Sequence, residues 1–284
     1  MLVEWVKVNH GDKMAAKELN AIIADTVFLT SETMILRVIP DNWEIPDYSP
    51  GQFTVLGLPA STPRVDISDE EEGSHPPEKT IMRSYSIASS SHAKEYLEFY
   101  ISLVRSGSLT PRLFSLQRGD RIFMRPKISG MFTLDEIPKE SNLIFIGTGT
   151  GIAPYMSMIR TFIRPDDNRN LTVIHGARHS WDLGYSSELS TLNNMLPNFH
   201  YIPAITRPER EVIKWGGTTG YIQEIWQSGI ADSDWGTKAS PDNTHIFLCG
   251  NPTMVEEMAA LLASEGYPEH KKREPGLVHL ERYW

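Results

Sequence analysis

Leu143-Ile144-Phe145-Ile146-Gly147-Thr148-Gly149-Thr150-Gly151-Ile152-Ala153-Pro154 joins an apolar run to a glycine-rich turn, and this combination indicates the fold class. Its first four residues are all apolar, which is typical of a strand buried on both faces of a parallel sheet. Three glycines alternate with other residues after it, and a helix-length segment begins near Pro154. Glycines let a backbone approach a diphosphate closely, and a helix N-terminus attracts negative charge. The stretch predicts a strand, a diphosphate-binding loop and a helix, with a purely structural turn as the alternative.

The rest of the C-terminal half repeats the alternation of buried strands and helices. Further apolar runs lie at 171–174, 201–205 and 245–248. Helix-length segments separate them, which indicates a parallel sheet covered by helices. The last helix has clear limits, because Asn251 can cap it, Pro252 suits its first position and Gly266 suits its end. We therefore predict an α/β, Rossmann-like domain over residues 139–284.

The N-terminal half has a different pattern of short alternating runs separated by turn residues. These runs lie at 24–29, 33–38, 52–56 and 96–101. This pattern favours an antiparallel β-barrel domain over residues 1–138. Residues 59–80 form a Pro/Ser-rich insertion with an acidic run at 66–72. It has too little apolar surface to order itself, so we predict a mobile surface loop between two strands, solvated rather than a docking segment.

Length and composition limit the possible functions. A chain of 284 residues is long enough for two domains, each with its own core. Its single cysteine, Cys249, excludes a disulfide framework and a cysteine-ligated iron–sulfur cluster within the chain. The net charge of −9 argues against general nucleic-acid binding. No segment has the length of a membrane span or the pattern of a signal peptide, so we expect a cytoplasmic monomer without a metal site.

Arg83-Ser84-Tyr85-Ser86 is a candidate flavin site. A strand sends Arg83 and Tyr85 to one face, where arginine can pair with a phosphate and tyrosine can cover an aromatic ring. Ser86 points the other way unless the strand twists or ends, and it can then reach the flavin N5. Taken alone, these four residues fit an ordinary half-buried strand better. Gly107-Ser108-Leu109-Thr110 favours the flavin site over an ordinary strand, because its hydroxyls and the helix that follows can bind the same diphosphate.

Two arginines bear on the choice of coenzyme. Enzymes selective for NAD often place an acidic residue at the end of the second strand, where this chain has Arg178. Arg207 follows the next strand, and guanidinium groups match a 2′-phosphate in geometry. NADPH is therefore favoured over NADH. The alternative is that both arginines lie on solvated loops and contact no ligand.

In their order along the chain, these motifs resemble those of the ferredoxin–NADP+ reductase family, most closely its bacterial ferredoxin/flavodoxin reductases. The resemblance also rests on Gly51-Gln52-Phe53, on Cys249-Gly250-Asn251-Pro252-Thr253-Met254 and on the terminal Tyr283-Trp284. It extends from about Gly51 to Trp284. It implies an N-terminal FAD-binding barrel, a C-terminal NADP-binding domain and FAD held without a covalent bond.

The resemblance also implies roles for individual residues. Arg83 would bind the FAD diphosphate, Tyr85 would pack on the isoalloxazine and Ser86 would lie near N5. Tyr283 would cover the flavin as a movable gate, and Trp284 would stack on the adenine. The implied FAD site comprises Arg83, Ser84, Tyr85, Ser86, Ser108, Leu109, Thr110, Tyr283 and Trp284. The implied NADP site comprises Gly147, Thr148, Gly149, Thr150, Gly151, Arg178, Arg207, Cys249 and Gly250, and the implied catalytic residues are Ser86, Cys249, Glu281 and Tyr283.

The implied activity is hydride transfer between NADP(H) and FAD, with single electrons passing to or from ferredoxin or flavodoxin. Alternatives are the reductase component of an oxygenase system, a soluble ferric or flavin reductase, and a non-catalytic NADP(H)-binding module. Gly220-Tyr221-Ile222 stands where bacterial relatives often carry another arginine, and Arg210 or Lys214 is its candidate substitute. The basic run 270–273 either steers an acidic carrier or is a solvated helix end.

Overall fold

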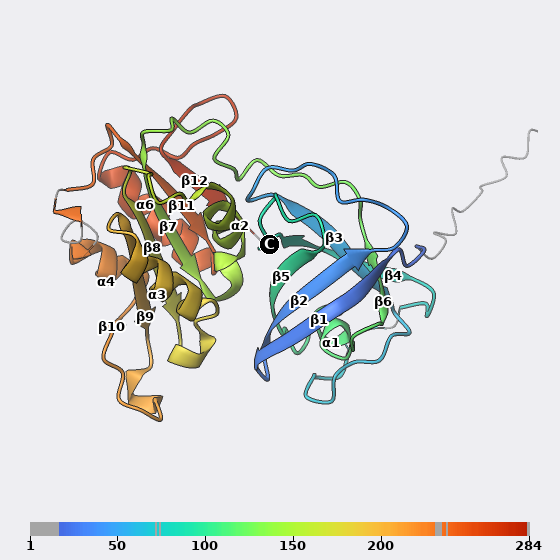
Figure 1. Cartoon of the computed structure of the whole chain (residues 1–284). Helices are drawn as coiled ribbons and strands as arrows, with labels where there is room; N and C mark the ends of the chain where they lie inside the picture. The colour runs from blue at the N-terminus through green and yellow to red at the C-terminus, as the bar shows by residue number, and fades with distance from the viewer. Residues whose placement is uncertain (1–16, 72, 74, 231–234, 237, 283–284) are drawn as a thin grey trace, which may run out of the picture.

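The computed structural model describes residues 17–71, 73, 75–230, 235–236 and 238–282 (Figure 1). Two six-stranded sheets lie side by side, one built from each half of the chain. The predicted class, an antiparallel domain followed by a parallel α/β domain, is confirmed. Tyr283 and Trp284 lie outside the described residues.

The first sheet has the strand order β4-β3-β6-β1-β2-β5, and its paired strands are antiparallel. Its apolar side chains form a core that includes Leu36, Leu56 and Phe99. The strand β4 is at the end of this order and pairs with β3. The elements of this half are β1 (Ala21–Thr30), β2 (Thr33–Pro40), β3 (Phe53–Pro59), β4 (Thr80–Ser86), β5 (Leu97–Ser102), α1 (Thr110–Leu113) and β6 (Arg121–Met124).

The second sheet is parallel and has the order β10-β9-β8-β7-β11-β12. The strands β8, β9 and β10 follow one another outward on one side of β7, and β11 and β12 lie on its other side. Ligands bind at such switch points, beyond the carboxyl ends of the strands. The elements are β7 (Asn142–Thr148), η1 (Gly149–Ile152), α2 (Ala153–Phe162), β8 (Leu171–Ala177), η2 (Ser180–Asp182), α3 (Ser186–Met195), β9 (Phe199–Ile205), η3 (Pro208–Arg210), β10 (Thr218–Thr219), α4 (Ile222–Gln227), β11 (Thr244–Cys249), α6 (Pro252–Ser264) and β12 (Val278–Glu281).

Helices cover both faces of the parallel sheet. The side chains of α2 and α3 pack on one face, together with Ile35 and Tyr100 from the first domain. The side chains of α4 and α6 pack on the other face. The helix α6 begins as predicted, because Asn251 Oδ1 accepts hydrogen bonds from the amides of Thr253 (2.9 Å) and Met254 (3.3 Å). The helices of the described chain are too short or too polar to cross a bilayer.

The acidic insertion lies between β3 and β4 as predicted, but the prediction that it is solvated is wrong for Glu71. The carboxylate of Glu71 binds Arg112, with 2.7 Å between Oε2 and Nη2. The Arg112 side chain is only 4% exposed and also donates to the carbonyl oxygens of Ala60 and Ser108. A buried guanidinium needs a partner that carries charge or accepts hydrogen bonds. This need holds the acidic loop against the barrel.

The interpretation of the basic run 270–273 as a helix end is also wrong. The helix α6 ends earlier, at Ser264. Lys271 and Glu274 exchange backbone hydrogen bonds of 2.9 Å in both directions, so the run forms a tight turn before β12. The His270 ring stacks on His279, with 4.6 Å between ring centroids. Local backbone pairing and ring stacking therefore shape this segment.

Candidate functional site

A cavity of about 1160 Å³ opens at the carboxyl edge of the parallel sheet and reaches the first domain. The loop Thr148-Gly149-Thr150-Gly151 forms one side, together with Gly250 and Asn251 after β11. Arg178, at the end of β8, and Tyr221, before α4, extend the wall. The β1–β2 turn contributes residues 30–33 from the first domain. The cavity therefore lies at the switch point and between the two domains.

The glycine loop packs so closely against the end of β11 that side chains would not fit at two glycines of this contact. A Cβ at Gly151 would lie 2.6 Å from the Cys249 carbonyl oxygen. A Cβ at Gly250 would lie 2.3 Å from Thr148 Oγ1, and its φ of +129° disfavours other residues. The N-terminus of α2 has no side-chain cap. A nucleotide diphosphate fits this cradle, because the backbone can approach it closely and the helix end attracts its charge.

His175 contacts the glycine loop, and the sequence analysis did not predict this role. It is fully buried on β8, with its Nε2 3.3 Å from the Gly149 carbonyl oxygen and its Nδ1 3.2 Å from the Tyr201 hydroxyl. Burial lowers the pKa of His175 to about 4, although the contact with Gly149 opposes this shift. The imidazole is therefore neutral near pH 7. A histidine at the end of an apolar strand beside the glycine loop was the available signal.

The structure brings together three of the four residues expected at the reacting centre. Ser86 Oγ, at the end of β4, donates to Glu281 Oε2 over 3.0 Å. Cys249 Sγ lies 3.6 Å from the same oxygen. Cys249 and Glu281 occupy paired positions at the ends of β11 and β12. Ser86 comes from the other domain, so this cluster joins the two halves of the molecule. The fourth residue, Tyr283, lies outside the described residues.

The β4 motif lies on the terminal strand of the first sheet. Arg83 and Ser84 are exposed, Tyr85 is partly buried and Ser86 is buried. Burial raises the pKa of Tyr85 well above its ordinary value. Along β4 the motif therefore offers an exposed guanidinium, then a half-covered ring and then a buried hydroxyl. This order suits a ligand that is charged at one end and aromatic at the other. A flavin nucleotide fits this arrangement.

The second flavin motif contributes less than its residue types suggest. The Leu109 side chain is 2% exposed and belongs to the barrel core. The Thr110 hydroxyl contacts the backbone of Val104, accepting from its amide (2.9 Å) and donating to its carbonyl (3.2 Å). These contacts tie Thr110 to its own loop. The Ser108 side chain remains the candidate diphosphate contact of this motif.

The two arginines proposed for the 2′-phosphate are neighbours in the structure. Arg178 is exposed and lines the cavity. The Arg207 amide donates to the Arg178 carbonyl over 3.0 Å, which places the two residues side by side, although Arg207 is outside the cavity lining. Arg210 and Lys214 are exposed and also outside that lining. Arg178 is the best-placed of these cations.

Comparisons with known proteins agree with the order of the two domains. The family model described as "Oxidoreductase FAD-binding domain" matches residues 72–131, and "Oxidoreductase NAD-binding domain" matches residues 145–260. The flavodoxin/ferredoxin–NADP reductase of Buchnera aphidicola subsp. Baizongia pistaciae is 31% identical over 86% of this chain and 90% of that protein. The chain belongs to the flavodoxin/ferredoxin–NADP reductase family. The family member from Escherichia coli (strain K12) is 32% identical over 84% of this chain and 88% of its own.

A solved structure supports the fold of this flavodoxin/ferredoxin–NADP reductase family member. It is the ferredoxin NADP+ reductase of Neisseria gonorrhoeae with bound FAD and NADP. The TM-score is 0.78 at 23% identity, over 93% of this chain and 98% of that one. The two chains therefore share the same arrangement of a barrel followed by a parallel α/β domain.

Proposed function

We propose that this protein transfers hydride between NADP(H) and FAD and passes single electrons between FAD and ferredoxin or flavodoxin. The observation that carries the proposal is the contact of Glu281 with both Ser86 and Cys249, beside the glycine-loop cavity. It joins the flavin motif of one domain to the nucleotide motif of the other. FAD, when bound, supplies the conversion between a two-electron hydride and single electrons.

Each motif has a distinct binding task in this proposal. Arg83 and Ser108 hold the FAD diphosphate, and Tyr85 packs on the flavin ring. The loop 147–151 holds the diphosphate of NADP(H). Arg178 and Arg207 bind the 2′-phosphate, which favours NADP(H) over NAD(H). Tyr283, the predicted gate, lies outside the described residues.

The residues at the reacting centre orient groups and shape charge. Glu281 accepts the Ser86 hydroxyl hydrogen and fixes the direction of that hydroxyl. Cys249 places a polarizable sulfur beside the same carboxylate. The chain would contribute to the rate by holding the flavin and the nicotinamide close together in the two motifs. No proton relay between side chains is required.

The names of the relatives support ferredoxin or flavodoxin as partners. A separate carrier is also consistent with the single cysteine, which excludes a cysteine-ligated cluster within this chain. We propose that the protein acts as a cytoplasmic monomer. The basic turn 270–273 is a candidate steering element for an acidic carrier.

The deciding experiment is an anaerobic titration of the purified flavoprotein with NADPH and, in parallel, NADH. Rapid loss of the flavin absorption band with NADPH alone is the expected result. An equal response to NADH would favour an oxygenase-type or general flavin reductase. A yellow protein that neither coenzyme bleaches would contradict the proposal and favour a nucleotide-binding module.

A further inference from the structure

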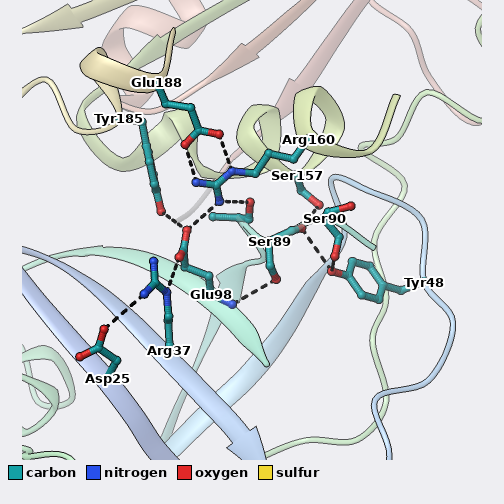
Figure 2. A network of polar contacts seen from close by, with 11 residues as sticks. Asp25, Arg37, Tyr48, Ser89, Ser90, Glu98, Ser157, Arg160, Tyr185 and Glu188 are labelled. Atoms are coloured by element: carbon teal, nitrogen blue, oxygen red, sulfur yellow. Dashed lines mark hydrogen bonds and ion pairs between the residues drawn. The ribbon is translucent and has the colours of Figure 1, made fainter. Parts of the chain in front are cut away.

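A network of polar contacts joins the helix α2 of the nucleotide domain to the flavin domain (Figure 2). Arg160, near the C-terminal end of α2, is its centre. Its Nη1 donates to Glu98 Oε1 over 2.7 Å and to the Ala88 carbonyl over 2.9 Å. Its Nε and Nη2 bind Glu188 of α3 at 2.8 and 2.6 Å. One guanidinium therefore connects two helices of one domain to two segments of the other.

Glu98 is the partner of Arg160 on β5 and is 1% exposed. It also accepts hydrogen bonds from Arg37 Nε and the Tyr185 hydroxyl, both at 2.8 Å. Burial alone would raise the pKa of Glu98, but the contacts with Arg160 and Arg37 outweigh it and lower the pKa. The carboxylate is therefore charged at neutral pH. Removing one partner from a buried ion pair is costly, so this contact resists opening.

Two more residues of α2 bind the same segment of the flavin domain. Ser157 Oγ donates to the Ser89 carbonyl over 2.7 Å, and Thr161 Oγ1 accepts from the Ser91 amide over 3.0 Å. Ser157, Arg160 and Thr161 are spaced i, i+3 and i+4, so they share one face of the helix. We call these three residues and Glu98 the interdomain clamp.

On both sides of the interdomain clamp, its residues are close along the chain to residues of the candidate site. Ala88 follows Ser86 by two residues, and its amide donates to the Glu98 carbonyl over 2.8 Å. On the other side, α2 begins at Ala153, immediately after the glycine loop. Arg160 lies seven residues further on, which is about 10 Å along a helix. A rotation of α2 about its clamped end would therefore move the nucleotide loop relative to Ser86.

The two domains also approach closely beside the interdomain clamp. The Tyr100 hydroxyl accepts from the Gly184 amide over 3.2 Å, and a Cβ at Gly184 would lie 2.4 Å from that hydroxyl oxygen. Tyr185, the next residue, has a φ of +61°, a strained value for a non-glycine residue. Its hydroxyl binds Glu98. The clamp therefore sits in a closely packed interface with little room to slide.

We propose that Arg160 and Glu98 are positioning residues, which set the distance between the flavin and the nicotinamide. The inference rests on the proposed function. Hydride transfer requires reacting atoms about 3–3.5 Å apart, and a misplacement of about 1 Å costs about 100-fold in rate. The interdomain clamp links the two binding motifs by a short path, so its loss changes the reaction rate more than it changes nucleotide affinity.

The test compares Glu98→Gln with Glu188→Gln in the FAD-loaded protein. Both variants remove one carboxylate charge from Arg160, but only Glu98→Gln weakens the contact between domains. We expect Glu98→Gln to lower the rate of flavin reduction at saturating NADPH by about 10- to 100-fold. The dissociation constant for NADP+ should change less than about threefold, because the glycine loop itself is intact. Glu188→Gln should stay within about threefold on both measurements.

Two controls separate positioning from general damage. Oxidation of dithionite-reduced protein by ferricyanide needs no nicotinamide, so Glu98→Gln should leave its rate unchanged. In cofactor-free protein, hydrogen exchange should become faster in residues 88–91 and in α2 for Glu98→Gln but not for Glu188→Gln. If Glu98→Gln does not fold, Ser157→Ala removes another contact of the interdomain clamp, the hydrogen bond to the Ser89 carbonyl, without touching a buried charge. The expected loss of the reduction rate is then about two- to fivefold, which corresponds to about 0.4–1 kcal/mol.

A wild-type reduction rate in Glu98→Gln, or an equal loss in Glu188→Gln, would overturn the positioning role. So would an equal loss in the ferricyanide reaction, because the damage would then lie at the flavin itself. Failure of the proposed function gives a different result, since wild-type protein would then show no reduction by NADPH.

Discussion

At the scale of single residues, the site consists of ordinary side chains whose surroundings give them specific tasks. Ser86 is one of several serines near the end of β4, but it is buried and donates to Glu281. His175 is kept neutral by burial and contacts the nucleotide loop. Residue type suggested the task of Ser86, whereas burial and contact define the task of His175.

Replacing Ser86 tests the reacting centre. Ser86→Ala removes the hydroxyl that binds Glu281, and loss of one oriented donor costs about 100-fold in rate. We expect this loss in the rate constant of flavin reduction by NADPH, measured by stopped-flow absorbance. FAD content and the thermal midpoint should match wild type. A rate within threefold of wild type would exclude Ser86 from the reacting centre.

His175 predicts a specific dependence of stability on pH. Its pKa is about 4 in the folded protein and about 6.5 when exposed, so the unfolded chain binds the proton first as the pH falls. Stability from this group is complete above pH 6.5 and decreases down to about pH 4, by up to about 1.4 kcal/mol per pH unit. Urea unfolding of His175→Gln should show a shallower decrease over this window. His92→Gln, at an exposed position, should follow wild type, and parallel curves for all three proteins would contradict the prediction.

At the scale of elements, loops carry as much of the organisation as helices and strands. The glycine loop, the acidic insertion and the segment 88–91 each follow a strand end and each bind another part of the chain. The helix α6 required only its own sequence signals, since Asn251 caps it locally. The acidic insertion required a partner from outside, Arg112. The structural order of the acidic insertion therefore depends on a buried charged group, the Arg112 guanidinium.

The pairing of Glu71 with Arg112 predicts that replacing this one glutamate of the acidic run destabilises the protein. Glu71→Gln weakens the partner of a guanidinium that is 4% exposed, and we expect a loss of about 1–3 kcal/mol in the free energy of unfolding. Glu70→Gln is the matched control, because Glu70 is exposed and lies next to it. Urea unfolding measures both variants. Equal stabilities would show that the acidic run is solvated after all.

At the scale of the whole molecule, the cavity and the interdomain clamp both span the two domains. Residues from the β1–β2 turn line the cavity opposite the glycine loop. The core between α2 and the parallel sheet includes Tyr100 of β5. A nucleotide in this cavity would therefore contact both domains.

This arrangement predicts a coenzyme-dependent thermal shift. At a concentration 100 times its dissociation constant, a ligand stabilises the folded state by about 2.7 kcal/mol. For a chain of 284 residues we expect this stabilisation by NADP+ to raise the thermal midpoint by roughly 5 °C. NAD+ at the same concentration should give a smaller rise, because it lacks the phosphate that Arg178 would bind. Arg178→Ala should reduce the NADP+ shift to the NAD+ level, and identical shifts in wild type would remove Arg178 from coenzyme selection.

Local patterns determined the elements of this protein from the sequence alone. Alternating runs, buried runs, the glycines of 147–151 and the cap at Asn251 identified both fold types and the glycine loop between β7 and α2. Such signals depend on backbone conformation and side-chain periodicity within a few residues. The same locality explains the error at Glu71, because its position depends on Arg112, 41 positions further along the chain. The turn 270–273 is formed by local backbone pairing that the charge pattern of the run does not indicate.

Only the tertiary structure decided which residues meet. Ser86 reaches Glu281 across 195 positions of sequence, and Arg160 reaches Glu98 across 62. No local pattern encodes these distances, because they depend on how two separately folded sheets pack. Burial then determined the charge states, keeping His175 neutral while paired guanidinium groups keep Glu98 charged. The sequence therefore specified the parts and their chemistry, and packing decided their geometry because electrostatic and hydride-transfer interactions depend on ångström distances.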